Sequence, residues 1–436
     1  MRGVWLDLPA TAQDILILIA LLLPALLTAL IVLRGFAPGS LVRALLWRFR
    51  WANAVFVALI AISVGMGIGL IAQERGLRRG TAQAADKFDM IVSAPGSEMT
   101  MMLAAVFLQP SAVPLLDGDT YNAVSTNPRV DVAAPLAFGD SHDGSPVIGT
   151  TADFVTYLSE DQVEGRMWTD TFEAIVGAGT SLEIGDSFVP AHGHGDAADH
   201  GAHGDSYTVV GKIPRNGSPW DRAIMVPVES VWAIHGLADG HAPDAEDRLG
   251  PPYDADFFPG TPAIVVRATS LPDTYALRSE FSRDGETMAF FPGAVLANLY
   301  RIMGDVRQAM SLMTLVTQVL VAASVLLGLF ILSRLFQRQL ALLRAIGAPA
   351  RFVMAVVWSY AAGLLATGSI LGLGTGYLAA AILGRVVTAR TDILVTASIG
   401  WSEVHLVAGF LSATAVLSLV PAWSVLRAPV MRAIRS

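Results

Sequence analysis

The chain has 436 residues, of which 53% are hydrophobic and only 15% charged, and its mean hydropathy is positive. Soluble globular proteins carry about 25% charged residues, so this composition indicates a membrane protein. The chain contains no cysteine, which excludes disulfides, thiolate catalysis and cysteine metal ligands. Any bound metal ion must therefore be held by histidine and carboxylate side chains.

The charge is divided unevenly along the chain. Residues 73–305 contain 33 acidic and 14 basic side chains, whereas the remainder contains 4 acidic and 15 basic ones. Seven of the eight histidines lie in the acidic part, and His405 is the exception. We therefore expect an acidic domain joined to a basic membrane part. The acidity of that domain argues against nucleic acid as a partner, because phosphates require a basic surface.

Five apolar stretches approach the length of about 20 residues that a membrane-spanning helix needs. They are Ile15–Leu33, Trp51–Ile71, Leu312–Leu332, Phe352–Leu383 and Val404–Val420. A signal peptide is the alternative for the first stretch, but its apolar run exceeds the about 7–15 residues of such a segment. We expect a retained helix, and an α-helical membrane protein with five spans.

Arginines indicate the orientation of these spans. The segments 34–50 and 334–351 and the tail after Pro421 carry arginines and no acid. Lys and Arg collect on the cytoplasmic side of short membrane loops, so we expect these three segments in the cytoplasm. Leu41, Leu45 and Phe49 could form the apolar face of a helix on the inner membrane surface. The N-terminus and the acidic domain are then expected outside.

The predicted organisation follows from these patterns. In chain order it consists of an extra N-terminal transmembrane helix (1–36), an amphipathic cytoplasmic segment with a transmembrane helix (37–72), an outer α+β domain (73–305), a transmembrane helix (306–333), a cytoplasmic segment (334–351), a transmembrane helix (352–384), an outer loop (385–403), and a last transmembrane helix with a basic tail (404–436).

The outer domain has mixed secondary-structure signals. Runs typical of strands, separated by Gly, Pro and Asp clusters, are Phe88–Val92, Val130–Leu136, Tyr207–Val210, Ala223–Val228 and Ala263–Arg267. Helical patterns occur at Glu229–Ile234 and Tyr275–Phe281, and another at Ala294–Met310 continues without a break into the third span. We find no credible nucleophile–base arrangement in this domain.

Glycines in two spans predict close helix packing. Gly65 and Gly69 in the second span form a small-xxx-small pair, for which ordinary glycine enrichment in membrane helices is an equal alternative. In the fourth span Gly368, Gly372 and Gly376 follow one another at four-residue steps. Three glycines on one face are a stronger indication that another helix approaches there.

The cytoplasmic segment 334–351 is patterned as a short helix. Its apolar residues Phe336, Leu340, Leu343 and Ile346 recur at helical spacing. Gly347, followed by Pro349, predicts the end of that helix. A short amphipathic helix between two spans could receive force from a soluble motor. The alternative is a positively charged topology determinant without a partner.

Four segments resemble the MacB/FtsX-like permease family of ABC transporters. They are ALLRAIGAPARFV (341–353), KFDMIVSAPGSEMTMMLAAVFLQP (87–110), GSPWDRAIMVPVESVWAIHG (217–236) and PAWSVLRAPVMRAI (421–434). With the order of one helix, an outer domain and three helices, the resemblance covers about residues 40–436. The helix at Ile15–Leu33 is extra to the four core helices of the family.

The resemblance implies the transmembrane subunit of a mechanotransmission-type ABC transporter. It implies a homodimer in a bacterial inner membrane, with the large domain in the periplasm. The implied partners are a separate ATPase and a periplasmic binding or accessory protein. The residues expected at the ATPase are Arg338, Leu343, Arg344, Ala345, Ile346 and Gly347. A P-loop requires a Gly-Lys-Ser/Thr sequence, and neither Lys87 nor Lys212 lies in one. We therefore expect no enzymatic activity in this chain.

A histidine-rich loop at 191–205, AHGHGDAADHGAHGD, is the one chemical site that the sequence suggests. Zn²⁺ accepts imidazole nitrogen and carboxylate oxygen, and the glycines favour capture and release over a rigid site. The candidate ligands for Zn²⁺ or another transition metal are His192, His194, His200, His203, Asp196, Asp199 and Asp205. A solvated low-complexity loop is the alternative. His235, His241, Asp239 and Asp244 could form a second cluster, although ordinary surface positions explain them better.

Two other functions stay open at this stage. The histidine loop suits a membrane-anchored metal receptor or chaperone without a motor. An outer domain that regulates a cell-wall enzyme, as in some members of the family, is the other. Cargo and direction of transport have no signature in the sequence.

Overall fold

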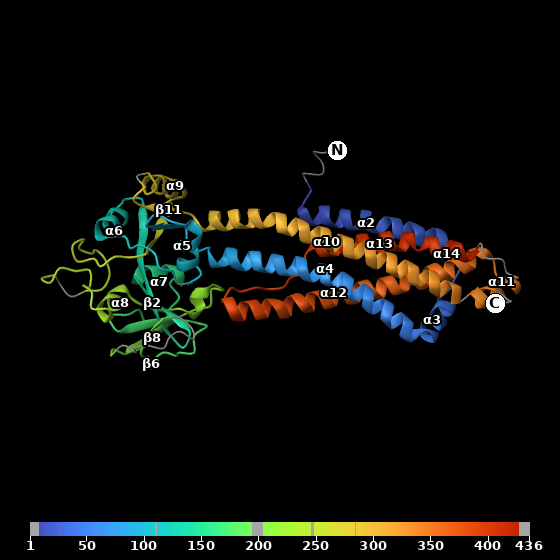
Figure 1. The fold of residues 1–436 in the computed structure, drawn as a ribbon, viewed down its shortest axis with the longest axis horizontal. Helices are drawn as coiled ribbons and strands as arrows, with labels where there is room; N and C mark the ends of the chain where they lie inside the picture. The colour runs from blue at the N-terminus through green and yellow to red at the C-terminus, as the bar shows by residue number, and fades with distance from the viewer. Residues whose placement is uncertain are drawn as a thin grey trace. The chain divides into compact units, whose positions relative to one another are not determined.

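The structure is a computed structural model that describes residues 8–109, 111–193, 204–245, 248–283, 285–335 and 337–426. It divides into two compact units (Figure 1). The helical unit comprises Met1–Gly76, Asp305–Arg385 and Thr396–Ser436, and the sheet unit comprises Leu77–Gly304 and Val386–Val395. Each unit is described by itself below.

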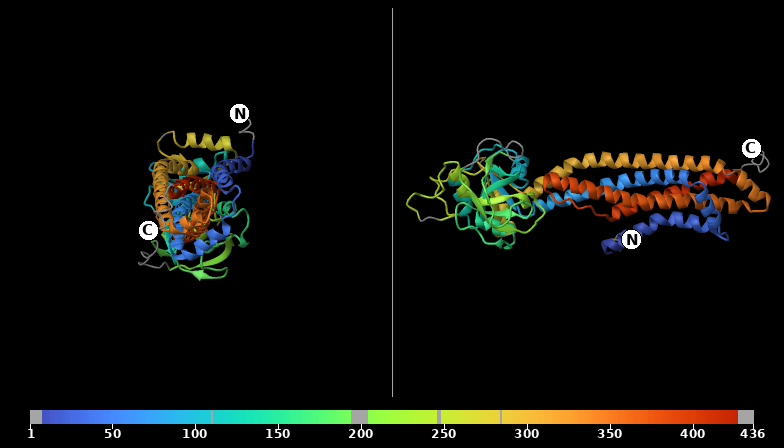
Figure 2. Two further views of the ribbon diagram at one scale, coloured as in Figure 1. Left: turned by 90° about the vertical axis from the view of Figure 1, so that its right-hand side faces the viewer. Right: turned by 90° about the horizontal axis from the view of Figure 1, so that it is seen from below.

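The helical unit is built from long helices that run alongside one another (Figure 2). Its elements, three of which also contribute residues to the sheet unit, are α2 (Ala10–Leu33), α3 (Gly39–Arg48), α4 (Arg50–Ala84), α10 (Pro292–Leu335), α11 (Gln337–Ala345), α12 (Ala350–Thr391), α13 (Trp401–Leu417) and α14 (Leu419–Leu426).

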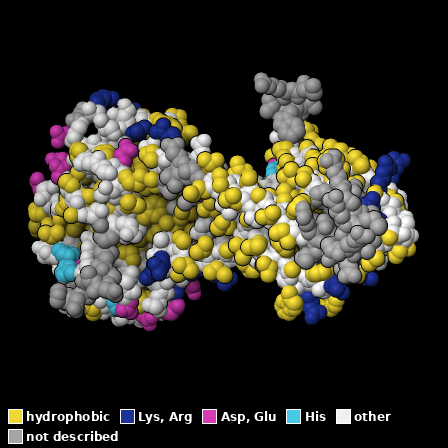
Figure 3. Space-filling view, turned by 45° about the vertical axis from the view of Figure 1, so that its right-hand side comes forward, with side chains coloured by type: hydrophobic (Ala, Val, Ile, Leu, Met, Phe, Trp, Pro, Cys, Tyr) yellow, Lys and Arg dark blue, Asp and Glu magenta, His cyan; other side chains and the backbone are white. Residues whose placement is uncertain are grey.

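Among the described residues, four helical stretches are long and apolar enough to cross a membrane. They are α2, α4, α12 and the α13–α14 stretch Trp401–Trp423, and α10 contains a shorter apolar stretch, Leu315–Gly328. Hydrophobic side chains cover much of the described surface of this unit in Figure 3, as expected for a protein that presents an apolar surface to lipid. The count of five spans stays a prediction.

The N-terminal helix α2 is packed into the bundle. The Ala25 amide donates a hydrogen bond to Ser412 Oγ of α13 at 3.2 Å. His405 Nε2 lies 3.0 Å from the carbonyl oxygen of Asp14. Val32 is buried with Ala355, Trp358 and Ala415 in a small apolar cluster. The stretch that the sequence marks as an extra helix is therefore an integral part of the helical unit.

The basic segments gather toward one end of the helical unit. Helices α3 and α11 lie toward the same end in Figure 1, and the space-filling view shows Lys and Arg side chains there (Figure 3). Helices α4 and α13 are joined by an ion pair. Arg75 of α4 donates a hydrogen bond to Glu403 of α13 at 2.8 Å, and the Glu403 side chain is fully buried. The orientation of the basic end relative to a membrane stays a prediction.

The five glycines singled out in the sequence lie where α4 meets α12. A Cβ added at Gly376 would come within 2.6 Å of the carbonyl oxygen of Gly65, and one at Gly65 within 2.7 Å of Thr375 Oγ1. A Cβ added at Gly368 would lie 2.6 Å from the Cβ of Ile60, and one added at Gly372 would lie 2.7 Å from the Cβ of Val64. One added at Gly69 would lie 3.5 Å from the carbonyl oxygen of Gly376. The backbones therefore approach to a distance that larger side chains would prevent.

The sheet unit contains a mixed sheet with short helices. Its elements are β1 (Met90–Ser93), α5 (Glu98–Ala105), α6 (Gly118–Ser125), β2 (Val130–His142), β3 (Ser145–Thr150), α7 (Ala152–Leu158), β4 (Glu164–Gly165), β5 (Glu173–Gly177), β6 (Ser187–Phe188), β7 (Ala191–His192), β8 (Tyr207–Ile213), η2 (Pro219–Arg222), β9 (Ile224–Pro227), α8 (Val228–Ile234), β10 (Ala263–Ala268), α9 (Leu271–Glu280) and β11 (Met288–Phe290).

The strands follow the order β11-β1-β10-β2-β3-β9-β5-β8-β4, with β7 paired to β2 and β6 paired to β8. Most neighbours are antiparallel, whereas β3 with β9 and β5 with β8 are parallel. The longest strand, β2, has different neighbours at its two ends. Strand β10 pairs with residues 130–136 of β2, and β3 and β7 pair with residues from 137 to 142.

The strands β1 and β9 are buried on both faces of the sheet. Successive side chains of a strand point to opposite faces, and here they enter two different cores. Met90 and Val92 belong to one cluster and Ile91 to the other, and on β9 Ile224 and Met225 divide in the same way. A sheet covered on both faces has nearly continuous apolar strands, which explains why the sequence signals were strong in this domain.

The predicted strands and helices of the outer domain agree closely with the structure. The five expected strands correspond to β1, β2, β8, β9 and β10, and the two expected helices to α8 and α9. The helix expected at Ala294–Met310 is continuous with the following apolar stretch in α10. The prediction missed strands β3, β5 and β11 and helices α5, α6 and α7. It also missed β4, β6 and β7, in which two residues are too few to show a period.

Three segment boundaries differ from those predicted. Helix α4 continues to Ala84, beyond the expected end at 72, and α12 continues to Thr391, beyond 384. Hydropathy marks where a helix becomes polar, not where it ends, and no proline interrupts either continuation. The expected outer loop 385–403 is divided, because Val386–Val395 belongs to the sheet unit: Arg222 pairs with Asp392 at 3.1 Å.

The α4–α12 contact predicts unequal effects for two substitutions in the same helix. Gly376→Ala places a Cβ against the Gly65 backbone, so we expect a loss of about 1–3 kcal/mol in stability from overpacking. For Gly374→Ala no described atom lies within 4 Å of the added Cβ, so this matched control should be neutral or stabilising through its better helix propensity. Thermal unfolding of the purified protein in detergent measures both, and equal melting temperatures would contradict the contact.

Candidate metal centre

Strand pairing brings His192 opposite a buried carboxylate. In the antiparallel pair of β2 and β7, Asp140 faces His192 and Ser141 faces Ala191. Side chains directly opposite each other in such a pair lie on the same face of the sheet. The pairing is extended at its end, where the Gly193 amide donates to the Gly139 carbonyl at 3.0 Å and Ser141 Oγ donates to the Gly193 carbonyl at 2.6 Å.

A register shift in β2 determines which way Asp140 points. Between Ala137 and Asp140 the pairing of β2 with β3 is interrupted. Such an irregularity changes the direction of the side chains that follow it. Asp140 and Ser141 are both buried as a result, with Asp140 only 1% exposed. A carboxylate so far removed from water requires charged or hydrogen-bonding partners.

The third member of the group is His235, the residue that caps the C-terminus of α8. Its Nδ1 lies 2.6 Å from the carbonyl oxygen of Val231, one helical turn earlier. A ring nitrogen that faces a carbonyl carries the proton, so the lone pair of the neutral ring is on Nε2. Nε2 is the atom directed at Asp140, 3.9 Å from Oδ2. This arrangement, in which the second nitrogen binds a backbone carbonyl, is usual for metal-ligating histidines.

The ligand atoms of the three side chains lie close enough to share a metal ion, although some of them are farther apart than in a closed metal site. His192 Nδ1 lies 3.0 Å from Asp140 Oδ1, and one ligand atom from each of the three residues lies within 4.8 Å of the others. Ligands at 2.0–2.1 Å from a tetrahedral Zn²⁺ are about 3.3 Å apart. Small movements of the two half-exposed imidazoles would therefore close the site around an ion.

The chemical types of the three ligand atoms restrict which metal ions the site can bind. Two imidazole nitrogens and one carboxylate oxygen suit Zn²⁺ and other divalent transition metals, whereas Ca²⁺ and Mg²⁺ prefer all-oxygen sites. Three protein ligands leave a fourth tetrahedral position for water or another ligand. Sites of this kind exchange ligands more readily than structural sites with four protein ligands.

Tyr207 lies near this group but stays protonated. Burial, together with the carboxylates of Asp140 and Asp205, raises the pKa of Tyr207 to about 12. Its ring stacks on Phe188, with centroids 5.4 Å apart. A neutral phenol is a weak metal ligand, so Tyr207 forms part of the wall beside the site rather than of the ligand set.

The structure places only one of the predicted metal ligands in this group. His192 is a member, whereas Asp205 is described and lies outside it. The other predicted ligands lie outside the described residues: His194, His200, His203, Asp196 and Asp199. The sequence analysis treated His235 as an ordinary surface residue, but the structure groups it with His192. His241 lies outside this group and is buried beside Tyr253.

Asp140 was missed by the sequence analysis. It lies 52 positions before His192 in the chain, and a single acid at the end of a strand has no pattern of its own. The only signal that could have found it is the run DSHDG at 140–144, which follows the predicted strand Val130–Leu136 and contains two acids and a histidine. Strand pairing, which cannot be read from spacing, makes the connection.

The predicted coupling residues lie on α11 and its end. Leu343, Arg344 and Ala345 are in the last turn, and Ile346 is 84% exposed. Gly347 has φ +107°, its amide donates to the Arg344 carbonyl, and the next amide donates to Leu343. These bonds form the glycine-dependent helix end that the sequence predicts. The side chain of Arg338 lies outside the described part of the structure.

Comparison with known proteins adds no identification. No protein-family model matches the chain, and no curated protein matches it either. Function must therefore be argued from the sequence and from the geometry of the described residues.

The metal centre predicts a specific loss of Zn²⁺ affinity. Asp140→Asn and His235→Ala should each weaken Zn²⁺ binding by about tenfold or more, because each removes one of three ligands. Isothermal titration of the purified full chain with Zn²⁺ measures the effect. Acidification should also weaken binding, since imidazole ligands must be deprotonated.

The matched control is His142→Ala, which removes a histidine on the same strand that is not a member of the group. It should leave the Zn²⁺ affinity unchanged. Wild-type affinity in Asp140→Asn would show that the ion binds elsewhere in the chain.

Proposed function

We propose that this chain is the transmembrane permease subunit of an ABC-type system, and that its sheet unit binds Zn²⁺ or a similar metal ion. In this proposal a separate ATPase supplies the motion and the chain passes it to a periplasmic domain. The observation that carries the proposal is α11, a short basic helix between two long helices, α10 and α12, that both contain apolar stretches.

Helix α11 has the properties of a docking element. Leu340 is buried in the helical unit, so one side of the helix is anchored. Ile346, at its end, is 84% exposed although it is a large apolar residue. An isolated exposed isoleucine is common, but one presented on a basic segment with a fixed helix end suits contact with another protein. The four arginines of segment 334–351 support its cytoplasmic location.

Three helices link the helical unit covalently to the sheet unit. Helices α4, α10 and α12 each contribute residues to both units. A continuous helix transmits displacement along its axis better than a flexible linker does. This continuity supports a mechanical role, in which ATP-driven movement at α11 reaches the domain beyond the membrane. The proposal retains the five-span topology, the homodimer and the inner-membrane location expected from the resemblance.

The metal centre supplies the second part of the proposal. Asp140, His192 and His235 come from three elements of the sheet unit, β2, β7 and α8. An ion bound there would link these elements, and a change in their spacing would change its affinity. The open fourth position supports transfer of the ion, or of a metal-linked cargo, rather than permanent storage.

A membrane-anchored metal receptor or chaperone without a motor is the second candidate. The same three residues favour it, because a receptor needs the metal centre but not α11. The two candidates differ in their dependence on nucleotide. A receptor would bind and release the ion identically with and without ATP, whereas a permease subunit would form a complex with a P-loop ATPase.

The permease proposal predicts the effect of one substitution on α11. Tagged wild-type protein purified from its native membrane should bring a P-loop ATPase with it and show ATP hydrolysis. Ile346→Asp should reduce both by about tenfold or more, because it puts a charge into an apolar contact. Mass spectrometry of the purified complex and a phosphate-release assay are the measurements.

Leu237→Asp is the matched control, since Leu237 is an exposed apolar residue of the sheet unit, 52% exposed. It should leave the ATPase association unchanged. Absence of any P-loop ATPase from the wild-type preparation would leave the receptor as the better candidate.

A further inference from the structure

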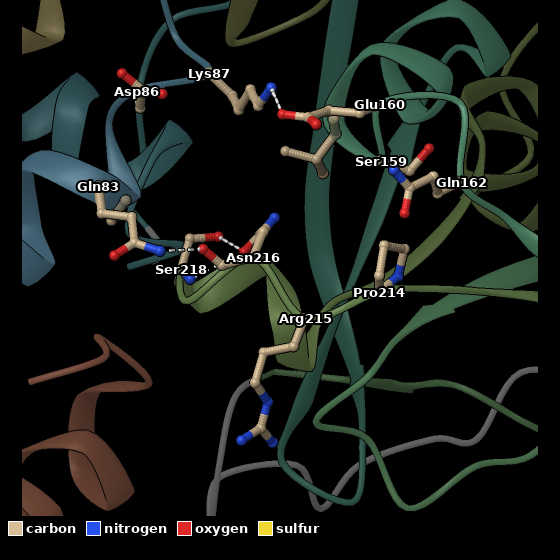
Figure 4. A pocket seen from close by; sticks show the side chains of 12 residues that line it. Gln83, Asp86, Lys87, Ser159, Glu160, Gln162, Pro214, Arg215, Asn216 and Ser218 are labelled. Carbon is tan, nitrogen blue, oxygen red and sulfur yellow. Dashed lines mark hydrogen bonds and ion pairs between the residues drawn. The ribbon is translucent and has the colours of Figure 1, made fainter. Parts of the chain in front are cut away.

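A polar cavity lies in the sheet unit and shares no lining residue with the metal centre (Figure 4). Its volume is about 340 Å³, at the lower end of the about 300–1,000 Å³ of small-molecule sites. Its walls are the end of α4 with the residues that follow, the end of α7 with the residues that follow, and the loop from Pro214 to Ser218.

The Pro214–Ser218 wall is fixed before any ligand binds. The buried Asp221 carboxylate accepts hydrogen bonds from the amides of Asn216 and Gly217, at 2.8 and 2.9 Å. Asn216 Oδ1 accepts from the amide and the hydroxyl of Ser218, at 2.9 and 2.7 Å. From the α4 side, Gln83 Nε2 donates to the Asn216 carbonyl at 2.8 Å. A wall held by this many bonds is preorganised, which lowers the entropic cost of binding.

The wall after α7 is held in an unusual conformation. Glu160 and Asp161 both have positive φ, +53° and +60°, a region that residues other than glycine rarely occupy. Residues kept in such conformations cluster at ligand-binding and active sites. Here the conformation presents the Glu160 carboxylate to Lys87, with Nζ and Oε1 2.6 Å apart.

The charged groups of the cavity are balanced and separated. Asp86, Lys87 and Glu160 lie together on one side in Figure 4, and Arg215 lies on the opposite side, with Gln83, Asn216 and Ser218 between. Lys87 is committed to Glu160 and also lies over the Tyr157 ring, 5.5 Å from its centroid. The Arg215 side chain is 66% exposed, and its Nε is 4.0 Å from Asp221. One side therefore offers carboxylates with capacity to accept more bonds, and the other a guanidinium.

A ligand with a single charge does not fit this distribution. With Lys87 paired to Glu160, the side formed by Asp86, Lys87 and Glu160 still carries one net negative charge. An anion bound at Arg215 would leave that charge unbalanced, and a cation bound beside Asp86 would leave the positive charge of Arg215 unbalanced within the cavity. The ends of α4 and α7, which carry partial negative charge at their carbonyl groups, favour a cationic group on that side. The amide side chains between the two sides match peptide-like polar groups.

We propose that this cavity binds a small zwitterion, an amino acid or dipeptide, with its carboxylate at Arg215 and its ammonium group at Asp86 and Glu160. The proposal is independent of the metal centre and of the ATPase. It assigns the sheet unit a second ligand of different chemistry, recognised by opposite charges at two ends of one cavity.

Isothermal titration of the full chain in detergent with alanylalanine tests the proposal. Alanylalanine should bind, and its N-acetylated form and its C-terminal amide should each bind about tenfold more weakly or worse, because each loses one charge-assisted contact. Alanine, titrated in parallel, reports whether the shorter zwitterion also spans the two sides. Failure of both alanylalanine and alanine to bind would overturn the proposal, as would equal binding of the capped forms.

Arg215→Gln and Asp86→Asn should each weaken alanylalanine binding by about tenfold. Arg166→Gln, which changes an exposed arginine of the sheet unit outside the cavity, should not. Arg215→Glu should shift the preference to the C-terminal amide, an outcome that loss of folding cannot imitate. Unchanged binding in Arg215→Gln would contradict the assignment of the carboxylate. A Zn²⁺ titration of the same variants should match the wild type.

Discussion

The pairing of β2 with three partners is the constraint on which the sheet unit depends. Residues 130–136 of this strand pair with β10, and residues from 137 to 142 pair with β3 and β7. The register shift before Asp140 separates these two regions. The first region sets the position of the two-sided core, and the second sets the position of the metal centre. A slip by one residue would turn Asp140 to the other face of the sheet and separate it from His192.

The helical unit is governed by a different constraint, the distance between backbones. Van der Waals packing drives helix association in a membrane, because lipid is as apolar as the side chains. Small residues allow α4 and α12 to approach until Gly376 meets the carbonyl of Gly65. The basic helices α3 and α11 lie toward one end of the same bundle.

The sequence predicted regular elements well and the metal centre poorly, for physical reasons. Strands of the sheet unit are apolar on both faces, helices are long, and Gly347 with Pro349 marks a helix end by backbone chemistry alone. Asp140, His192 and His235 carry no such local signal, because their proximity is produced by a two-residue strand and a helix cap. Composition pointed to the correct loop for His192, but spacing within the loop could not supply partners from other elements.

His192 is positioned by main-chain hydrogen bonds rather than by the packing of its own ring. The Gly139 and Gly193 backbones and the Ser141 hydroxyl fasten the strand on which it lies. A change in the sequence of the stretch 194–203 that keeps these bonds therefore leaves His192 in place. Among related chains, variation should concentrate in that stretch while the short strand and the serine beside Asp140 persist.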